Sequence, residues 1–251
     1  MSATEFLERF DQIVHKIQAT QLDNIRRAGQ ACAASIAAGR AVHLFGSGHS
    51  VIPVLDVFPR YGGYVGFHPI MDPRLMWTNV TGPGGARELL WLERTEGYIK
   101  QVLLSHHLDP RDSLIIYSHG GLNAAPVEMA LAGKEKGLTV IAITSLANRQ
   151  LNKPTHSSGK ALADIADIVI DNCCPPEDAL VSVPDRPEKV GGSSTTAAMI
   201  ISAAVLSETT AELVKRGKTP GRIFVSPNVP GVPPNNNLQV FEDYMKFEKS
   251  L

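Results

Sequence analysis

Three short loops of this chain combine glycine with hydroxyl side chains. They are GSGHS at 46–50, SHGGLN at 118–123 and GGSST at 191–195. Glycine lets main-chain N–H groups turn towards an anion, and serine and threonine add hydroxyl donors. An ordinary turn would explain any one of them, but three together favour a site for a single phosphate group. Such a group can be held by neutral donors without a metal, which agrees with the lack of lysine in these loops.

The first loop does not match the common nucleotide-binding loops. A dinucleotide fingerprint needs a third glycine where Val51 stands, together with an acidic residue about 20 positions later. A Walker loop needs a lysine, whereas His49 and Ser50 follow Gly48. The motif G-x-S-x-G of hydrolases is absent from the sequence. We therefore expect neither a bound dinucleotide nor nucleotide hydrolysis.

The composition excludes several classes of partner. The chain has 251 residues and a formal net charge of −1, with no basic run that would attract nucleic acid. We find no apolar stretch of the roughly 18 residues that span a bilayer and no signal-peptide core, and so expect a cytoplasmic protein without a membrane partner. The three cysteines and eight histidines lack the spacing of metal sites, which predicts no metal and no cofactor.

Alternating strands and helices must position the loops. Strands are expected at 40–45, 64–67, 113–117, 138–144 and 168–171, and helices at 88–104 and 126–136. Apolar runs of this kind suit parallel strands covered on both faces. The rhythm predicts a doubly wound α/β sheet, in which ligands bind at the carboxyl ends of the strands.

Helices and irregular segments flank this sheet. Ser2 and Glu5 form a possible capping box for a first helix, and a second helical run extends from about Asp23 to Gly39. Prolines predict an ordered loop or lid at 172–190, followed by a long helix capped by a residue of the third loop. The tail has a small strand at 223–225 and a last helix at 238–249. The expected organisation is a helical segment at 1–39, packed on the core or on a partner subunit, an α/β domain at 40–217 and its extension at 218–251.

The motifs HLFGSGHS, SHGGLNAAPVE, HSSGKALADIADIVIDN, PPEDALV and FVSPNVPG resemble the SIS (sugar isomerase) domain family, especially its branch labelled UPF0309. The resemblance covers nearly the whole chain. It implies a five-stranded parallel sheet between helices, a sugar phosphate ligand held by serine-rich loops, and a homodimer or homotetramer. No DNA-binding segment precedes the domain, which disfavours the regulators of this family.

The resemblance also assigns site residues. In the second loop, Gly120 and Asn123 replace the serine and threonine that are usual there, so phosphate contacts would use backbone N–H groups and the asparagine amide. The expected phosphate-binding residues are Gly46, Ser47, Gly48, Ser50, Ser118, Gly120, Gly121, Asn123, Ser193, Ser194 and Thr195.

An aldose–ketose isomerisation needs a base that moves a proton between adjacent carbons through an enediolate, and carboxylates or histidines can do this. Glu93 and Glu96 are three apart on the expected helix, with a solvated helix face as the alternative. We prefer Glu96, because Glu96-Gly97 resembles a functional helix of the N-acetylmuramate-6-phosphate etherases. His49 and His119, inside two loops, are further catalytic candidates unless they are satisfied loop histidines.

A phosphosugar isomerase is therefore the expected function, with a non-catalytic sugar phosphate sensor and an etherase-like lyase as alternatives. The etherase alternative is weakened because Leu55-Asp56 lacks the carboxylate that should follow. Glu177 and Asp178 are additional base candidates, although an exposed loop pair is the simpler interpretation. His43, within a strand, is expected in the core, and His106 on the surface.

Overall fold

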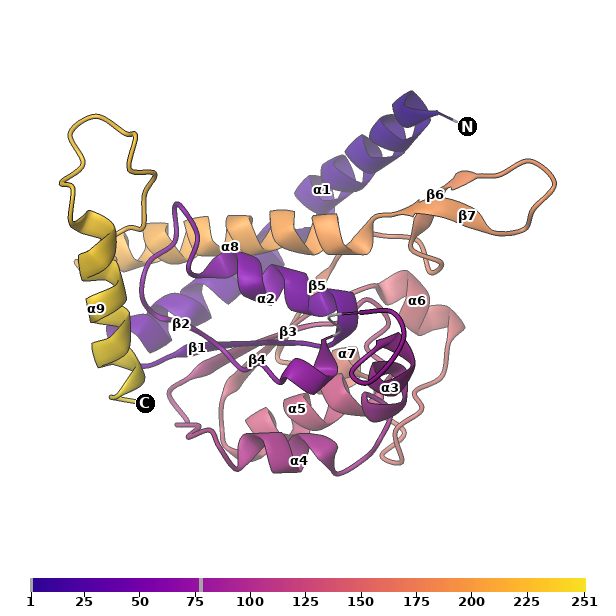
Figure 1. The fold of residues 1–251 in the computed structure, drawn as a ribbon, viewed down its shortest axis with the longest axis horizontal. Helices are drawn as coiled ribbons and strands as arrows, with labels where there is room; N and C mark the ends of the chain where they lie inside the picture. Colours follow the sequence, from indigo (N-terminus) through magenta and orange to yellow (C-terminus); the bar gives the residue numbers. More distant parts are fainter. Residues whose placement is uncertain (1, 77–78) are drawn as a thin grey trace.

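Five parallel strands form the centre of the structure, a computed structural model that describes residues 2–76 and 79–251. The strand order is β2-β1-β3-β4-β5, as expected for a doubly wound sheet (Figure 1). Every residue of β1 and β3 is buried, which agrees with their apolar sequences. The strands are β1 (Val42–Gly46), β2 (Phe67–Pro69), β3 (Ser113–Tyr117), β4 (Thr139–Thr144) and β5 (Ile168–Asp171).

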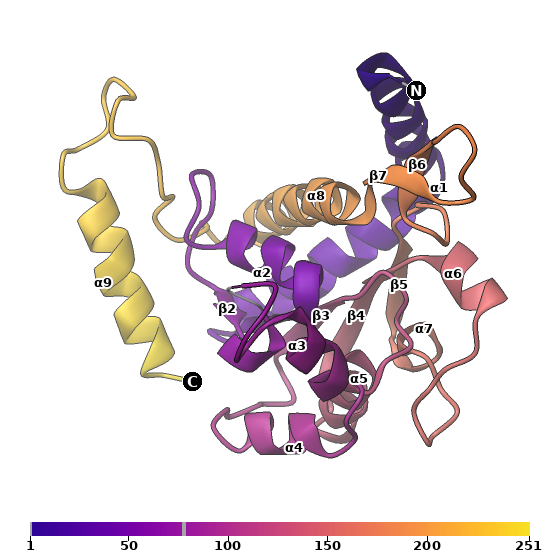
Figure 2. The same cartoon turned by 45° about the vertical axis from the view of Figure 1, so that its right-hand side comes forward.

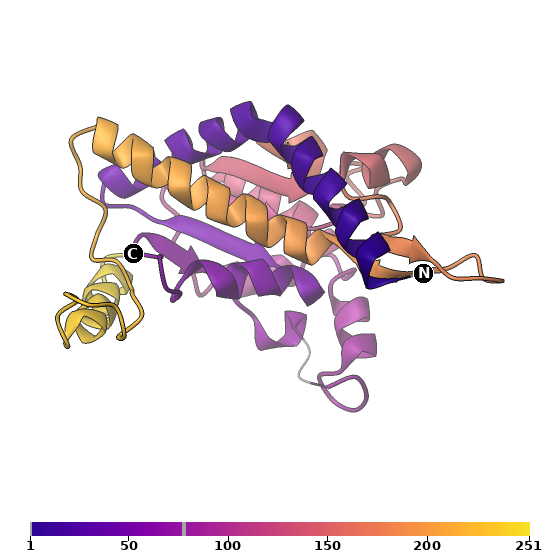
Figure 3. The ribbon, with the colours of Figure 1, turned by 90° about the horizontal axis from the view of Figure 1, so that it is seen from above.

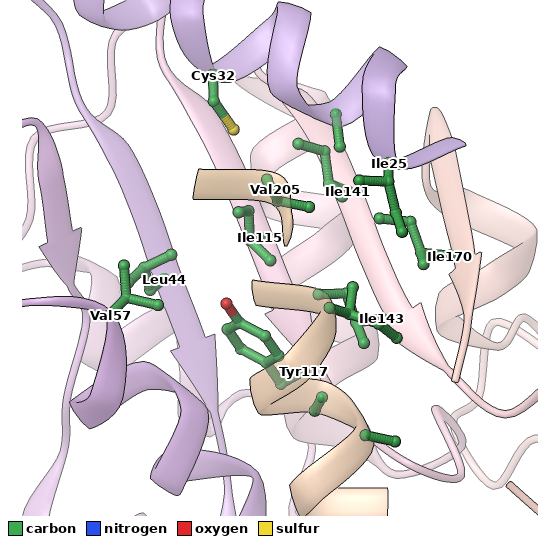
Figure 4. Close-up of a cluster of buried hydrophobic side chains, with 14 of the residues drawn as sticks. Ile25, Cys32, Leu44, Val57, Ile115, Tyr117, Ile141, Ile143, Ile170 and Val205 are labelled. Carbon is green, nitrogen blue, oxygen red and sulfur yellow. The ribbon is translucent and has the colours of Figure 1, made fainter. Parts of the chain in front are cut away.

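Helices cover both faces of this sheet (Figure 1). On one face lie α1 (Ala3–Ala37), α2 (Val51–Val57) and α8 (Ser194–Lys215). They enclose a core in which side chains of α1, α2 and α8 meet alternate residues of the strands (Figure 4). The other face is covered mainly by α4 (Tyr98–Leu103), α5 (Ala124–Glu135) and α7 (Leu162–Ile165), near which α3 (Ala86–Leu92) and α6 (Leu146–Leu151) also lie.

The N-terminal segment is one helix rather than the two expected. Ser2 caps α1 by accepting the N–H of Glu5, as the sequence predicts. The helix then continues through the polar residues in its middle because Gln21 is buried there. The Gln21 side chain accepts a hydrogen bond from the N–H of Asp171, at the end of β5. A tertiary contact thus supports the segment where the sequence pattern suggested a break.

Two other expected elements differ in the structure. The helix predicted at 88–104 is divided: α3 ends at Leu92, and α4 begins after Gly97, whose φ of 85° is a left-handed conformation that a continuous α-helix does not contain. The proline-rich segment contains an antiparallel hairpin of β6 (Ala179–Ser182) and β7 (Lys189–Gly192), which was expected to be irregular. Its prolines lie before and between the two strands, where they remove no hydrogen bond of the ladder.

The second strand and the tail also depart from expectation. β2 begins at Phe67, three residues later than predicted, and the strand expected at 223–225 is a single bridge between Ile223 and Tyr64. The last helix, α9 (Asn236–Glu248), stands beside the body of the molecule (Figure 2). It attaches through buried Val240 and through Tyr244, whose ring packs on Phe58.

α8 is the central helix of one face and crosses the sheet beside α1 (Figure 3). Contrary to the sequence expectation, its length and hydropathy match those of a membrane-spanning helix. The core helix of a folded domain has the same properties, and α8 packs on α1 and α2, with Ile201 and Val205 buried between them and the sheet.

Candidate functional site

The carboxyl ends of β1 and β3 lie side by side, since the two strands pair from Val42 with Ser113 to Gly46 with Tyr117. The strand order places the topological switch point between these strands, where open α/β sheets bind ligands. Loop 1 (46–50) leaves β1 at this point and loop 2 (118–123) leaves β3. Two of the three loops found in the sequence are therefore neighbours at the expected crevice.

Loop 1 turns so tightly that only glycine fits at its start. A Cβ atom on Gly46 would lie 2.1 Å from the backbone oxygen of Ser50. Gly48–Ser50 forms a single 3₁₀ turn that leads directly into α2. The turn brings His49 and Ser50 to the wall of a pocket, whereas the Ser47 hydroxyl donates to a carboxylate just after the end of α3.

That carboxylate belongs to Glu93, the residue immediately after α3. It is only 7% exposed, so the alternative of a solvated helix face is wrong for this residue. Its Oε2 accepts from the Ser47 hydroxyl at 2.9 Å, and its Oε1 accepts from the Asn123 amide, also at 2.9 Å. Glu93 therefore connects loop 1 to loop 2, and burial raises the pKa of its carboxyl group.

Loop 2 folds onto its own hydroxyl group. The N–H of Gly121 donates to Ser118 Oγ at 3.1 Å, which leaves the hydroxyl proton of Ser118 for another acceptor. The Asn123 amide, expected to contact a phosphate, instead donates to Glu93. Ser118 is thus the residue of loop 2 whose hydroxyl both lines the pocket and keeps a proton to donate.

His119 has both ring nitrogens engaged. Nε2 lies 3.2 Å from the backbone oxygen of Pro176, which can only accept, so Nε2 carries the proton. Nδ1 lies 3.4 Å from the side-chain amide nitrogen of Asn172, and the Asn172 oxygen in turn accepts from the N–H of Cys174. This arrangement orients the ring and ties loop 2 to the segment after β5.

The third loop was expected to cap α8 with one of its own hydroxyls, and this is incorrect. Asp178 caps the helix instead, because its Oδ1 accepts from the N–H groups of Ser193 at 2.9 Å and Ser194 at 2.6 Å. Ser193 is fully buried and its hydroxyl donates to the backbone oxygen of Asp178. Ser193 is thus engaged within the protein, whereas Ser194 and Thr195 remain on the pocket wall.

A pocket of about 180 Å³ lies between these loops. Sequence reasoning did not include Asn172 as a site residue, although its position directly after β5 was a usable signal. It also treated Asp178 as part of an exposed pair, but only Glu177 is exposed. The polar lining consists of His49, Ser50, Tyr117, Ser118, His119, Asn172, Asp178, Ser194 and Thr195.

Neither glutamate is among the described lining residues of this pocket, but Glu93 is bonded to loops 1 and 2, whereas the preferred catalytic candidate, Glu96, is bonded elsewhere. Its carboxylate accepts from the N–H and hydroxyl groups of Ser157, and it lies 3.7 Å from His156 Nε2. A larger hollow of about 690 Å³, between α4 and α5, includes His156 in its wall. This hollow is lined by leucines and surface charges and not by the three loops, so we assign the site to the smaller pocket.

Charges in and around the pocket are few. Lysine and arginine are missing from the residues described as lining it. Throughout 2–76 and 79–251, no three His, Cys, Asp or Glu side chains are placed to hold a metal ion. The geometry therefore offers hydroxyls, amides, histidine rings and carboxylates as the groups that could act on a ligand.

Comparisons with known proteins agree with this fold. The family model of the SIS domain matches residues 5–145. A UPF0309 protein of Thermoanaerobacter pseudethanolicus is 36% identical over 253 residues and covers 98% of this chain and 99% of its own. Another UPF0309 protein, of Caldanaerobacter subterraneus subsp. tengcongensis, is 35% identical over 96% of both chains.

Among solved structures, a phosphoheptose isomerase from Francisella tularensis has the same fold, with a TM-score of 0.54 and 15% identity over 83% of this chain and 98% of its own. The family match covers more than half of the chain, and the identity to the UPF0309 proteins extends over nearly all of it. The chain therefore belongs to the SIS domain family and is similar to the UPF0309 proteins within it.

Proposed function

We propose that the chain is a phosphosugar isomerase that interconverts aldose and ketose phosphates, including those of amino sugars, by proton transfer through an enediolate. Glu93 is the observation that carries the proposal. It is a buried carboxylate with a raised pKa, held between the two loops of the β1/β3 switch point. A carboxyl group with a raised pKa is suited to accepting and returning a proton. The SIS family membership supports a phosphosugar ligand.

In this proposal the phosphate is bound by loops 1 and 2. Ser50 and Ser118 line the pocket, and neutral hydroxyl and N–H donors can hold one phosphate monoester. Ser47 and Asn123 keep the Glu93 carboxylate in one orientation, which matters because a base must approach the carbon-bound proton from a fixed direction. His119 serves as a tie between loops, since both of its nitrogens are engaged.

The experiment is a panel of pentose, hexose, heptose and amino-sugar phosphates incubated with the protein in deuterated water and followed by NMR. The proposal predicts aldose–ketose exchange for at least one of these compounds, with deuterium entering carbon 1 or carbon 2. Exchange without deuterium, or no exchange across the panel, would contradict proton transfer.

A non-catalytic sugar phosphate sensor is the second candidate. It is favoured by one observation: both carboxylate oxygens of Glu93 already accept from protein donors, as a purely structural bridge would. The sensor predicts that a sugar phosphate raises the melting temperature without turnover. It further predicts that Glu93→Gln leaves this rise unchanged. The two candidates therefore differ in aldose–ketose exchange and in deuterium incorporation, which only the isomerase produces. Both keep the expectation of a homodimer or homotetramer in the cytoplasm, which size-exclusion chromatography and cell fractionation would test.

A further inference from the structure

A carboxylate lies in the wall of the same pocket as the serine and threonine hydroxyls. Asp178 lines the pocket together with Ser50, Ser118 and Thr195, with no lysine or arginine among the described lining residues. A phosphate and a carboxylate repel each other when no cation lies between them. A phosphosugar can occupy this pocket only if its phosphate lies away from Asp178.

The Asp178 carboxylate is fixed where it stands. Its Oδ1 accepts from the N–H groups of Ser193 and Ser194, at the positive end of the α8 dipole. Burial acts to raise the pKa of Asp178, but the hydrogen bonds from Ser194 and Ser193 prevail and lower it. The group therefore carries its negative charge at neutral pH and cannot swing away without uncapping α8.

Asp178 can still accept hydrogen bonds from a ligand. The N–H groups of Ser193 and Ser194 donate to Oδ1, and the Ser194 hydroxyl also bonds to this carboxylate. A carboxylate has about four acceptor sites on its two oxygens, so Asp178 keeps acceptor capacity for a ligand. Hydroxyl and ammonium groups are donors that match it, whereas a second carboxylate or phosphate has no donor to offer. The chemistry of the α8 side of the pocket is thus opposite to that of loops 1 and 2.

We propose that Asp178 is the specificity-determining residue of this pocket. It selects ligands with one phosphate, held by loops 1 and 2, whose other end carries hydroxyls or an amine, and it rejects ligands with a second anionic group. The inference rests on the proposed phosphosugar function. It disfavours an etherase activity on sugar acids such as muramate 6-phosphate, whose lactyl carboxylate would add that second charge.

The test compares dissociation constants by calorimetry for glucitol 6-phosphate, 6-phosphogluconate and glucosamine 6-phosphate. The first two differ only at carbon 1, which is an alcohol in one and a carboxylate in the other. The variant is Asp178→Asn, because asparagine tolerates the φ of 67° at this position and keeps an oxygen to cap α8. Asp185→Asn is the matched control, since Asp185 has φ 58° but is exposed at the tip of the hairpin.

We expect the unmodified protein to bind 6-phosphogluconate at least about tenfold more weakly than the other two compounds. Asp178→Asn should reduce this difference to within about threefold, while Asp185→Asn should leave it unchanged. Equal binding of all three compounds by the unmodified protein, or an unchanged ratio in Asp178→Asn, would overturn the inference but not the proposed function. Failure of all three compounds to bind would contradict the proposed function as well.

Discussion

Two polar clusters lie at opposite ends of the same strands. At the amino ends, the buried Asp112 carboxylate accepts from Arg40 Nε at 3.0 Å, from the N–H of Ala41 at 3.0 Å and from His43 Nε2 at 3.1 Å. His43 Nδ1 in turn lies 3.2 Å from His68 Nδ1. These groups satisfy one another, and we call Arg40, His43, His68 and Asp112 the amino-end cluster.

At the carboxyl ends, polar groups instead surround a pocket. Ser118 accepts one internal hydrogen bond and retains a proton to donate, and Ser50 and Thr195 also line the pocket wall. A cluster whose members satisfy each other stabilises the fold, because an unpaired buried group is costly. A cluster that borders a cavity keeps capacity for a ligand. Removing a residue should therefore affect stability at one end and ligand chemistry at the other.

The largest expected effect is the loss of stability in Asp112→Ala. The change leaves Arg40 and His43 buried without their carboxylate, which should lower the free energy of unfolding by about 3–5 kcal/mol. Urea denaturation followed by circular dichroism measures it. Asp243→Ala, on α9 and with a side chain that is 45% exposed, should change the same quantity by less than about 0.5 kcal/mol. Equal losses in both variants would contradict the stabilising role of the amino-end cluster.

Glu93→Gln should show the opposite pattern. Because burial raises the pKa of Glu93, its charged form costs free energy at neutral pH, and neutral glutamine should shift the melting temperature by less than about 4 °C. Loss of the base should lower turnover about 10²–10⁴-fold. Deuterium incorporation into the sugar phosphate measures turnover, with exposed Glu88→Gln on α3 as the control. Unchanged turnover would show that Glu93 stabilises the two loops and is not the catalytic base.

Acid should weaken the amino-end cluster in two steps. Burial and the nearby His43 lower the pKa of His68 to about 4, so the unfolded chain binds the proton more tightly and stability falls as the pH drops from about 6.5 towards 4. Burial opposes ionisation of Asp112, but hydrogen bonds from His43 and Arg40 lower its pKa to about 2, and its contribution is lost below about pH 3.8.

His68→Gln should remove the upper step, about 1 kcal/mol after allowance for partial exposure, whereas His15→Gln on the exposed face of α1 should not. Unfolding free energies measured between pH 7 and pH 4.5 provide the readout. If the unfolding free energy of His68→Gln falls with pH as it does in the unmodified protein, protonation of His68 is not the cause of the upper step.

Glu96→Gln should have the smallest effect. Glutamine can still accept from Ser157, and Glu96 is bonded to Ser157 rather than to loops 1 and 2, so we expect turnover within about threefold of the unmodified protein. The same deuterium assay measures it. A loss as large as that of Glu93→Gln would restore Glu96 as the base and contradict the assignment of the site.

The sequence predicts the sheet well because strands such as 113–117 and 168–171 can be recognised from their own apolar residues, without knowledge of distant contacts. The expectation for His43 is confirmed, as this side chain is buried in β1. His106, expected on the surface, is half-buried against the His68 ring. That contact joins residues far apart in the chain, which local patterns do not encode.

The same reason explains the differences at the site. Glu93 is 46 residues from Ser47 and 30 residues from Asn123 in the sequence. Asp178, which caps α8, is 15 residues from Ser193. Local spacing placed Glu93 and Glu96 on one helix face, but α3 ends at Leu92 and α4 begins only after the left-handed Gly97, so both residues lie in the connection between two helices. The loops could be found from their composition, whereas their partners follow from the folded sheet.

The central claim is that a phosphate binds between loops 1 and 2 at the β1/β3 switch point. A crystal structure with glucitol 6-phosphate tests it most directly. The account predicts the phosphate within hydrogen-bonding distance of the Ser50 and Ser118 hydroxyls, with the sugar hydroxyls towards Asp178. A phosphate bound in the hollow between α4 and α5, or one bound beside Asp178 with the sugar towards loop 1, would contradict it.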